Sequence, residues 1–251
     1  MTKKAVGERD LNDYSANYPG PFEEIQTKFR RIKVLEILNL YAPKIILEVG
    51  CGKDSVVNYL SYSTFDKFII AEPISSFLEG AVTNKSNKIT SLNCRIEDIP
   101  KFNYKIDFVI ISSLLHEVDD PLRVLKTIYK LVDKETIVHI NVPNAESFHR
   151  ILAKEMGIIS SVFEMSATQI LLQQSHTYNY ESLTKLIELS GFVVIDKGSY
   201  FIKPFTHKQM QLMLDNKIIN TNVLEGLDRM IKYFPDMGSE IYLNVRKKNG
   251  S

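Results

Sequence analysis

Apolar residues recur along this chain with two spacings, one typical of amphipathic helices and one typical of buried strands. Six large apolar side chains lie three or four positions apart: Phe22, Ile25, Phe29, Ile32, Leu35 and Leu38. This spacing places them on one face, so we predict a helix over Phe22–Leu40. A mostly apolar run over Lys44–Val49 follows Pro43 and predicts a strand that is covered on both faces.

The alternation of helical and strand patterns continues up to residue 142. We predict a short helix over Asp54–Tyr62, a strand over Phe68–Ala71, a helix over Ser75–Thr83, strands over Ile89–Asn93 and Ile106–Ile111, a helix over Pro121–Leu131 and a strand over Thr136–Val142. Pro121 suits the first turn of its helix, where no backbone N–H is needed. Strands that alternate with helices form parallel sheets with helices on both faces. The sequence therefore predicts an α/β fold with a doubly wound, mostly parallel sheet.

Residues 144–180 break this alternation, because helical spacing continues there without a strand. We interpret this segment as a helical insertion over the sheet. Beyond it we predict a helix over Glu181–Ser190 closed by Gly191, a strand over Phe192–Ile195, helices over His207–Leu214 and Val223–Tyr233, and a strand over Ile241–Val245. No repeat or low-complexity linker divides the chain. We therefore predict a single domain over residues 1–251, in which residues 1–40 form an N-terminal helical arm or lid.

Composition and charge narrow the classes of function. With 44% hydrophobic and 24% charged residues, the 251-residue chain is typical of a globular protein. Its 31 basic and 30 acidic residues nearly cancel, so it has no overall field to attract a nucleic acid. The sequence contains neither a signal-peptide pattern nor an uncharged segment of membrane-spanning length, and we expect a cytoplasmic protein without a membrane partner. Cys51 and Cys94 are expected to be small buried thiols rather than a disulfide or a zinc site.

The first predicted strand leads directly into a turn with two glycines, Gly50-Cys51-Gly52. Glycine lets a backbone turn tightly and approach a ligand closely, which serves either a dinucleotide or S-adenosylmethionine. Dinucleotide sites usually have a third glycine and lack an acidic residue beside the pyrophosphate, whereas here Glu48 precedes the turn and Asp54 follows it. Carboxylates suit the ammonium and sulfonium groups of S-adenosylmethionine. We therefore predict that Glu48, Gly50, Gly52 and Asp54 bind this cofactor.

Acidic residues also follow the second and third predicted strands. Glu72 is placed to accept hydrogen bonds from both ribose hydroxyls, but NAD enzymes use the same arrangement, so this residue does not distinguish the two cofactors. Asp98, next to Glu97, is a candidate acceptor for the adenine amino group. The alternative for Asp98 is an acid in a solvated loop.

Taken in order, these motifs resemble those of class I S-adenosylmethionine-dependent methyltransferases. The glycine turn is similar to their first motif, Glu72 to their ribose-binding acid and Glu97-Asp98 to their adenine loop. Residues Ser112–Pro121 are similar to the segment after their fourth strand. The resemblance implies a seven-stranded, Rossmann-like sheet and adds Glu97 and Ser112 to the predicted cofactor-binding residues.

Later segments resemble a bacterial, small-molecule subgroup of these enzymes (type 11/23-like) that is often linked to the modification of surface-glycan precursors. These segments are Asn141–Arg150, Met156-Gly157, Ser175–Tyr178 and Phe201–Phe205. The resemblance covers nearly the whole chain from Glu48 onward. The sequence departs from the pattern at Asp54, where the family often has its third glycine, and at Tyr178, where a basic residue is expected. The second departure concerns the recognition of the substrate.

Histidines lie in the segments that should follow the carboxyl ends of the strands, where open α/β sheets bind ligands. His116 follows the fourth predicted strand, and His149 and His176 lie in the insertion and at its return. Transfer of a methyl group to a hydroxyl needs an aligned acceptor and a base, so we predict these three as catalytic residues. The alternatives are a loop histidine for His116 and capping or packing for the others. His139 is expected to pack between layers, and His207 to begin a peripheral helix.

Four residues are predicted to bind the acceptor: Tyr18, Arg150, Tyr178 and Lys203. Arginine binds phosphate oxygens in pairs and lysine supplies a point charge, so Arg150 and Lys203 favour an anionic acceptor. The alternative for these two residues is a solvated position at the surface. Tyr18 belongs to the N-terminal arm, where an aromatic face could cover the sulfonium, and an ordered arm is the alternative.

The resemblance implies an S-adenosylmethionine-dependent methyltransferase (EC 2.1.1.-) that uses no metal and releases S-adenosylhomocysteine. The expected acceptor is an oxygen of a phosphorylated or nucleotide-linked polysaccharide or capsule precursor, with a histidine as the base. An NAD-linked oxidoreductase and a cofactor-binding relative without activity remain the alternatives. We expect a small-molecule substrate and no nucleic-acid partner. The sequence does not specify the acceptor, the choice between O- and N-methylation or the oligomeric state.

Overall fold

A seven-stranded sheet forms the centre of the computed structural model, which describes residues 21–84 and 86–248. The strands are β1 Ile45–Val49, β2 Lys67–Ala71, β3 Ile89–Leu92, β4 Phe108–Ser112, β5 Ile137–Pro143, β6 Phe192–Tyr200 and β7 Glu240–Lys247. They lie in the order β3-β2-β1-β4-β5-β7-β6, and β7 runs antiparallel to both of its neighbours while the pairs from β3 to β5 are parallel. The predicted doubly wound, mostly parallel sheet of seven strands is confirmed.

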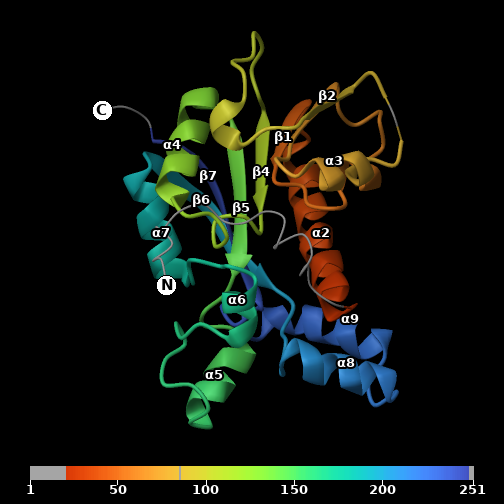
Figure 1. Ribbon diagram of the computed structural model, residues 1–251, viewed down its shortest axis with the longest axis vertical. Coiled ribbons are helices and arrows are strands. Elements are labelled where there is room, and N and C mark those ends of the chain that lie inside the picture. Colours follow the sequence, from red (N-terminus) through yellow and green to blue (C-terminus); the bar gives the residue numbers. More distant parts are fainter. Residues whose placement is uncertain (1–20, 85, 249–251) are drawn as a thin grey trace, which may run out of the picture.

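Helices cover both faces of the sheet (Figure 1). On one face lie α2 (Pro21–Tyr41) and α3 (Ser75–Ala81), and on the other lie α4 (Pro121–Leu131) and α7 (Tyr180–Leu189). Other described helices lie beyond the end of the sheet: α5 Phe148–Glu155, α6 Ala167–Leu171, α8 His207–Asp215 and α9 Thr221–Arg229. Three 3-10 turns are also described: η1 Val56–Tyr59, η2 Ile96–Asp98 and η3 Met230–Lys232. Among the helices described here, none has both the length and the apolar character that a membrane crossing requires.

The apolar run predicted as the first strand is β1, in the interior of the sheet. Leu47 pairs with Ile69 of β2 on one side and with Val109 of β4 on the other, and all three side chains are fully buried. A strand with neighbours at both edges and helices on both faces has no solvent-facing side, which explains its apolar sequence. The chain passes from β1 to β2 and later returns to β4 on the other side. The carboxyl end of β1 is therefore a switch point of the kind where α/β folds bind ligands.

Local signals determine where α4 begins. Pro121 lies in the first turn, as predicted, and the side chain of Asp120 accepts a hydrogen bond from the backbone N–H of Arg123 at 2.8 Å. Leu125 and Ile128 follow at helical spacing and are fully buried in the core of this face. The start and the buried face of α4 are thus both explained by its own sequence.

Several predicted elements differ from the observed ones. The helix predicted over Val223–Tyr233 is α9, which ends at Arg229, followed by the 3-10 turn η3. The helix predicted over Asp54–Tyr62 is only the 3-10 turn η1, because the backbone is already extended at Leu60 (φ −103°, ψ 143°). Side chains bind the first N–H groups of this turn: Ser55 accepts from Val57 and Glu48 from Val56. The strand β6 continues past the predicted end at residue 195, because its polar second half pairs with β7 at the edge of the sheet. Within the predicted helical insertion, only α5 and α6 are regular helices.

Candidate functional site

A cavity of about 1540 Å³ lies at the carboxyl ends of the central strands. Its wall contains residues that end or follow β1, β2, β4 and β5, together with residues from α2, α5, α6 and α8. Small-molecule pockets usually measure about 300–1,000 Å³. The cavity is therefore large enough for two ligands side by side.

The glycine turn forms one part of this wall. Gly50 and Gly52 have φ angles of 72° and 61°, which side chains rarely adopt. A Cβ atom added to Gly50 would lie 3.2 Å from Cδ1 of Leu114, on the segment after β4. The backbone conformation therefore favours glycine at position 50, and a side chain there would also press on Leu114.

Glu72 lies directly after β2, is buried, and lines the cavity as predicted. Its Oε2 accepts a hydrogen bond from the backbone N–H of Gly52 at 3.1 Å, and its Oε1 accepts one from Ile74 at 3.0 Å. These two bonds hold the carboxylate beside the glycine turn. Glu72 is thus fixed at the wall of the cavity, at the position predicted for a ribose-binding acid.

The other two acids of the turn, Glu48 and Asp54, also line the cavity but have partners within the protein. Glu48 accepts from the Ser55 hydroxyl and, at 3.2 Å, from the N–H of Val56. Burial raises the pKa of Glu48 to about 7, although the Ser55 hydrogen bond opposes this shift. Asp54 forms an ion pair with Arg31 of α2 at 2.7 Å. Both carboxylates therefore stabilise the segment around the glycine turn. That either one contacts a cofactor directly stays a prediction.

The predicted adenine loop and Ser112 have different positions. Glu97 and Ser112 line the cavity, whereas Asp98 is exposed and is absent from its wall. Glu97 also lies 3.7 Å from Arg123, at the start of α4. The structure thus brings Glu97, rather than Asp98, to the cavity. Cys51 and Cys94 line the cavity as free, partly buried thiols rather than the buried ones we expected.

The three predicted catalytic histidines all line the cavity but fall into two groups. The backbone carbonyl of His116 accepts hydrogen bonds from the N–H groups of Ser175 at 3.0 Å and His176 at 3.3 Å, so these two segments lie together. His149 lies near Lys203 instead. Burial and then the charge of Lys203 hold the pKa of His149 well below its usual value, which keeps the imidazole neutral at neutral pH. His139 is fully buried beside Asn244, as expected.

Lys203 is buried, with 6% of its surface exposed, and it lines the cavity. Across residues 21–84 and 86–248, no hydrogen bond or ion pair joins its ammonium group to another side chain or to the backbone. Burial lowers the pKa of Lys203 to about 8, and the nearby carboxylates Glu23 and Glu240 oppose this shift. The solvated position that was the alternative for Lys203 is therefore wrong.

Arg150 also lines the cavity, but its guanidinium group binds oxygen atoms of other residues of the insertion. It donates to the backbone carbonyls of Val162, at 2.9 Å, and Glu164, and to Oε1 of Gln169 at 3.3 Å. Tyr178 is buried and is not part of the cavity wall as described. Tyr18, the remaining predicted acceptor-binding residue, lies outside the described residues.

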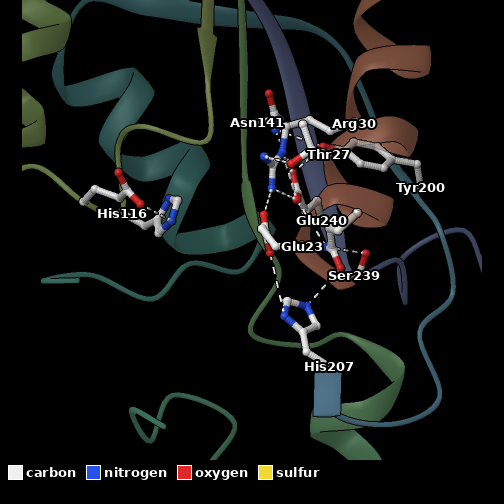
Figure 2. A network of polar contacts seen from close by, with 11 residues as sticks. Glu23, Thr27, Arg30, His116, Asn141, Tyr200, His207, Ser239 and Glu240 are labelled. Atoms are coloured by element: carbon white, nitrogen blue, oxygen red, sulfur yellow. Dashed lines mark hydrogen bonds and ion pairs between the residues drawn. The ribbon is translucent and has the colours of Figure 1, made fainter. Parts of the chain in front are cut away.

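A network of buried polar side chains beside the cavity was not predicted (Figure 2). Arg30 of α2 binds Glu240 of β7 and lies 3.0 Å from Oε1 of Glu23. His207 was expected to begin a peripheral helix, but its Nδ1 lies 3.7 Å from Glu23 Oε2 and the residue lines the cavity. His116 lies apart from this network. The feature of the sequence that could have indicated this network is Glu240, an acidic residue directly before the apolar run of the last strand.

Comparisons with known proteins agree with this architecture. A family model described as a methyltransferase domain matches residues 23–197. No curated protein sequence matches the chain.

Solved structures with similar folds include three methyltransferases. An S-adenosylmethionine-dependent enzyme from Mesorhizobium loti has a TM-score of 0.59 and 14% identity, over 87% of this chain and 98% of that one. Another from Thermotoga maritima has a TM-score of 0.59 and 16% identity, over 95% and 96% of the two chains. The N-methyltransferase NodS from Bradyrhizobium japonicum, solved with S-adenosyl-L-homocysteine, has a TM-score of 0.55 and 10% identity, over 93% and 91%. At these identities the comparisons establish a shared fold.

Proposed function

Because the chain belongs to the methyltransferase domain family, we propose that it is an S-adenosylmethionine-dependent methyltransferase that acts on a small-molecule acceptor. One observation carries the proposal: a single cavity is lined both by the glycine turn with Glu72 and by His149 with Lys203. Two sets of residues with different chemistry thus face the same space. The first suits a nucleoside cofactor and the second suits a polar acceptor.

The residues around the glycine turn fit this cofactor. Gly50 and Gly52 leave backbone rather than side chains at the wall, and Glu72 is held where it can accept hydrogen bonds from ribose hydroxyls. Glu97 lines the cavity in the predicted adenine loop. When bound, S-adenosylmethionine supplies a methyl group on a sulfonium and leaves as S-adenosylhomocysteine.

For the acceptor, we propose an oxygen of a phosphorylated or nucleotide-linked polysaccharide precursor. The support is Lys203, a buried residue of the cavity wall whose ammonium forms no hydrogen bond or ion pair with another described residue. A buried charge is costly unless an opposite charge pairs with it. An anionic group on the acceptor would provide that pair and would orient the hydroxyl next to it.

His149 is the proposed base. Its neutral imidazole has a lone pair that can accept the proton of the acceptor hydroxyl. The low pKa also makes His149 a weak base, so the proton should move only as the oxygen bonds to the methyl carbon and becomes acidic. Nε2 has this role in the tautomer whose Nδ1–H donates to Ser147 Oγ, which lies 3.1 Å from Nδ1.

The test begins with the cofactor. S-adenosylhomocysteine should raise the melting temperature of the protein and NAD should not, because a ligand at a hundred times its Kd stabilises the fold by about 2.7 kcal/mol. Stabilisation by NAD alone would contradict the proposal and favour an oxidoreductase. Product mass spectrometry with a panel of nucleotide sugars and phosphorylated glycan precursors then identifies the acceptor. His149→Gln should lower kcat while leaving the affinity for S-adenosylhomocysteine unchanged, and an unchanged kcat would exclude His149 as the base.

A further inference from the structure

Three large apolar side chains line the cavity although they are exposed. The exposed fractions are 66% for Ile158, 57% for Leu171 and 50% for Leu212. These residues come from the segment after α5, from the end of α6 and from α8. Single exposed apolar residues are ordinary on protein surfaces, but several around one cavity indicate a binding surface.

The insertion carries further exposed apolar side chains close in sequence to Ile158 and Leu171. Met156, Phe163 and Ile170 are exposed as well. In Figure 1, α6 and α8 both lie beyond the carboxyl end of β5, where the cavity is. The acceptor side of the cavity thus combines an exposed apolar surface with a buried ammonium group.

We propose that the acceptor is an anionic amphiphile, whose anionic group binds at Lys203 and whose hydrocarbon chain lies against Leu171 and Leu212. The inference rests on the proposed function: of the acceptors proposed there it selects the phosphorylated one, and it adds a hydrocarbon chain to that acceptor. Charge complementarity favours the anionic group. Glu23 and Glu240 influence Lys203, but its ammonium forms no hydrogen bond or ion pair with another described residue, and a neutral or cationic amphiphile would not provide one. The exposed apolar surface selects the hydrocarbon chain, since each methylene that leaves water strengthens binding by about fourfold.

The size of the cavity agrees with this occupant. Its volume of about 1540 Å³ exceeds what a single ligand usually fills, so an acceptor can lie beside the cofactor. His149 and His207 also line the cavity near Lys203, and the charge of Lys203 contributes to keeping both imidazoles neutral. They are therefore hydrogen-bonding groups rather than additional charges. Arg30 and Arg150 also line the cavity, but Arg30 binds Glu240 and Arg150 binds oxygens of residues 162–169. Among these three cations, Lys203 is therefore the one whose charge is left to bind an anionic group.

The probe for this inference is octyl phosphate, added to protein that is saturated with S-adenosylhomocysteine and measured by isothermal titration calorimetry. Octyl phosphate should bind at least tenfold more tightly than inorganic phosphate, octanol or octylamine. Lys203→Met should weaken octyl phosphate at least tenfold and leave the affinity for S-adenosylhomocysteine unchanged. Leu171→Ser and Leu212→Ser should each weaken octyl phosphate at least threefold without changing the affinity for inorganic phosphate.

The matched control is Leu40→Ser, which changes an exposed leucine of α2 that is not part of the cavity wall as described. It should leave all affinities unchanged. Equal affinities for octyl phosphate and inorganic phosphate would overturn the inference, and so would equal effects of the Leu40, Leu171 and Leu212 variants. A dimer that Leu171→Ser separates in sedimentation, with unchanged affinity for octyl phosphate, would also overturn it and assign the surface to a second copy of the chain. If the protein does not bind S-adenosylhomocysteine, the proposed function is wrong. If it binds S-adenosylhomocysteine but not octyl phosphate, only the proposal of an amphiphilic acceptor is wrong.

Discussion

Arg30 of α2 donates from Nε to both carboxylate oxygens of Glu240 on β7, at 3.0 and 2.9 Å. The two residues are 210 positions apart in the sequence, and both line the cavity. Tyr200 and Asn141 donate to the same carboxylate, and Glu240 is fully buried (Figure 2). The pair therefore joins the first described helix to the last strand at the wall of the proposed active site.

Glu240→Gln should destabilise the protein strongly, because it removes the negative charge opposite the buried Arg30 guanidinium. Breaking a buried ion pair by removing one partner costs about 3–5 kcal/mol. Urea unfolding at pH 7 measures this loss. Glu225→Gln is the matched control, since its carboxylate lies 3.7 Å from Arg229 at the surface, and it should change stability by less than about 1 kcal/mol. Equal losses of stability in the two variants would show that the buried ion pair stabilises the fold no more than the surface pair does.

The same carboxylate should make the fold sensitive to acid. Burial raises the pKa of Glu240, but the charge and hydrogen bonds of Arg30 outweigh burial and bring the pKa down to about 2, from an ordinary value of 4.5. Between pH 4.5 and pH 2 the unfolded chain therefore binds a proton that the folded chain does not, and stability falls as the pH falls. Glu240→Gln should show a shallower decline over this range in urea unfolding at several pH values. If stability declined equally with pH in the two proteins, the low pKa of Glu240 would be contradicted.

Gly50→Ala should weaken cofactor binding. The substitution puts a side chain on a residue with a φ of 72°, which strains the turn, and places Cβ 3.2 Å from Cδ1 of Leu114, so the turn or the Leu114 side chain must shift. We expect a stability loss of about 1–3 kcal/mol and no thermal shift with S-adenosylhomocysteine. Gly80→Ala is the control, because position 80 lies in α3 with open space around it, and there alanine should be neutral or stabilise the helix by up to about 1 kcal/mol. An unchanged response to S-adenosylhomocysteine in Gly50→Ala would separate the turn from the cofactor site.

Glu72→Gln should lower the affinity for S-adenosylhomocysteine at least tenfold, which corresponds to about 1.4 kcal/mol. The amide keeps the shape of the carboxylate but loses its charge and one of its two acceptors, so it cannot hold the N–H groups of Gly52 and Ile74 and also bind two ribose hydroxyls. Isothermal titration calorimetry measures the change. Glu79→Gln, on the exposed side of α3, should leave the affinity as it is. If both variants bind equally well, Glu72 has no ribose-binding role.

Lys203→Met should make the protein more stable at pH 7. The pKa of about 8 means that the folded state carries a buried ammonium below pH 8, and the thioether chain of methionine removes that cost. We expect a gain of about 1–3 kcal/mol. The unfolded chain binds the lysine proton up to about pH 10.5, so the gain should shrink as the pH rises from 8 toward 10.5. Lys126→Met, on the exposed side of α4, should show no such pattern. A loss of stability in Lys203→Met would contradict the prediction and show that the ammonium is paired in the folded protein.

The cofactor side of the site could be predicted largely from the sequence. Gly50, Gly52 and Glu72 follow directly after strands whose apolar runs are plain in the sequence, and the carboxyl ends of adjacent parallel strands meet at one edge of the sheet. The loop after β3 was less predictable. Glu97 and Asp98 are adjacent in the 3-10 turn η2, so their side chains point in different directions, and only Glu97 lines the cavity.

The sequence by itself determined the alternation of helices and strands, the glycine turn and its acids, because these depend on spacing and on neighbours a few residues away. Only the tertiary structure decided that Lys203 is buried, that Arg30 binds Glu240, and that His207 reaches the cavity. Burial and pairing of a polar side chain depend on which distant segments pack around it. For these residues, those segments come from opposite ends of the chain, and no local pattern records that they meet.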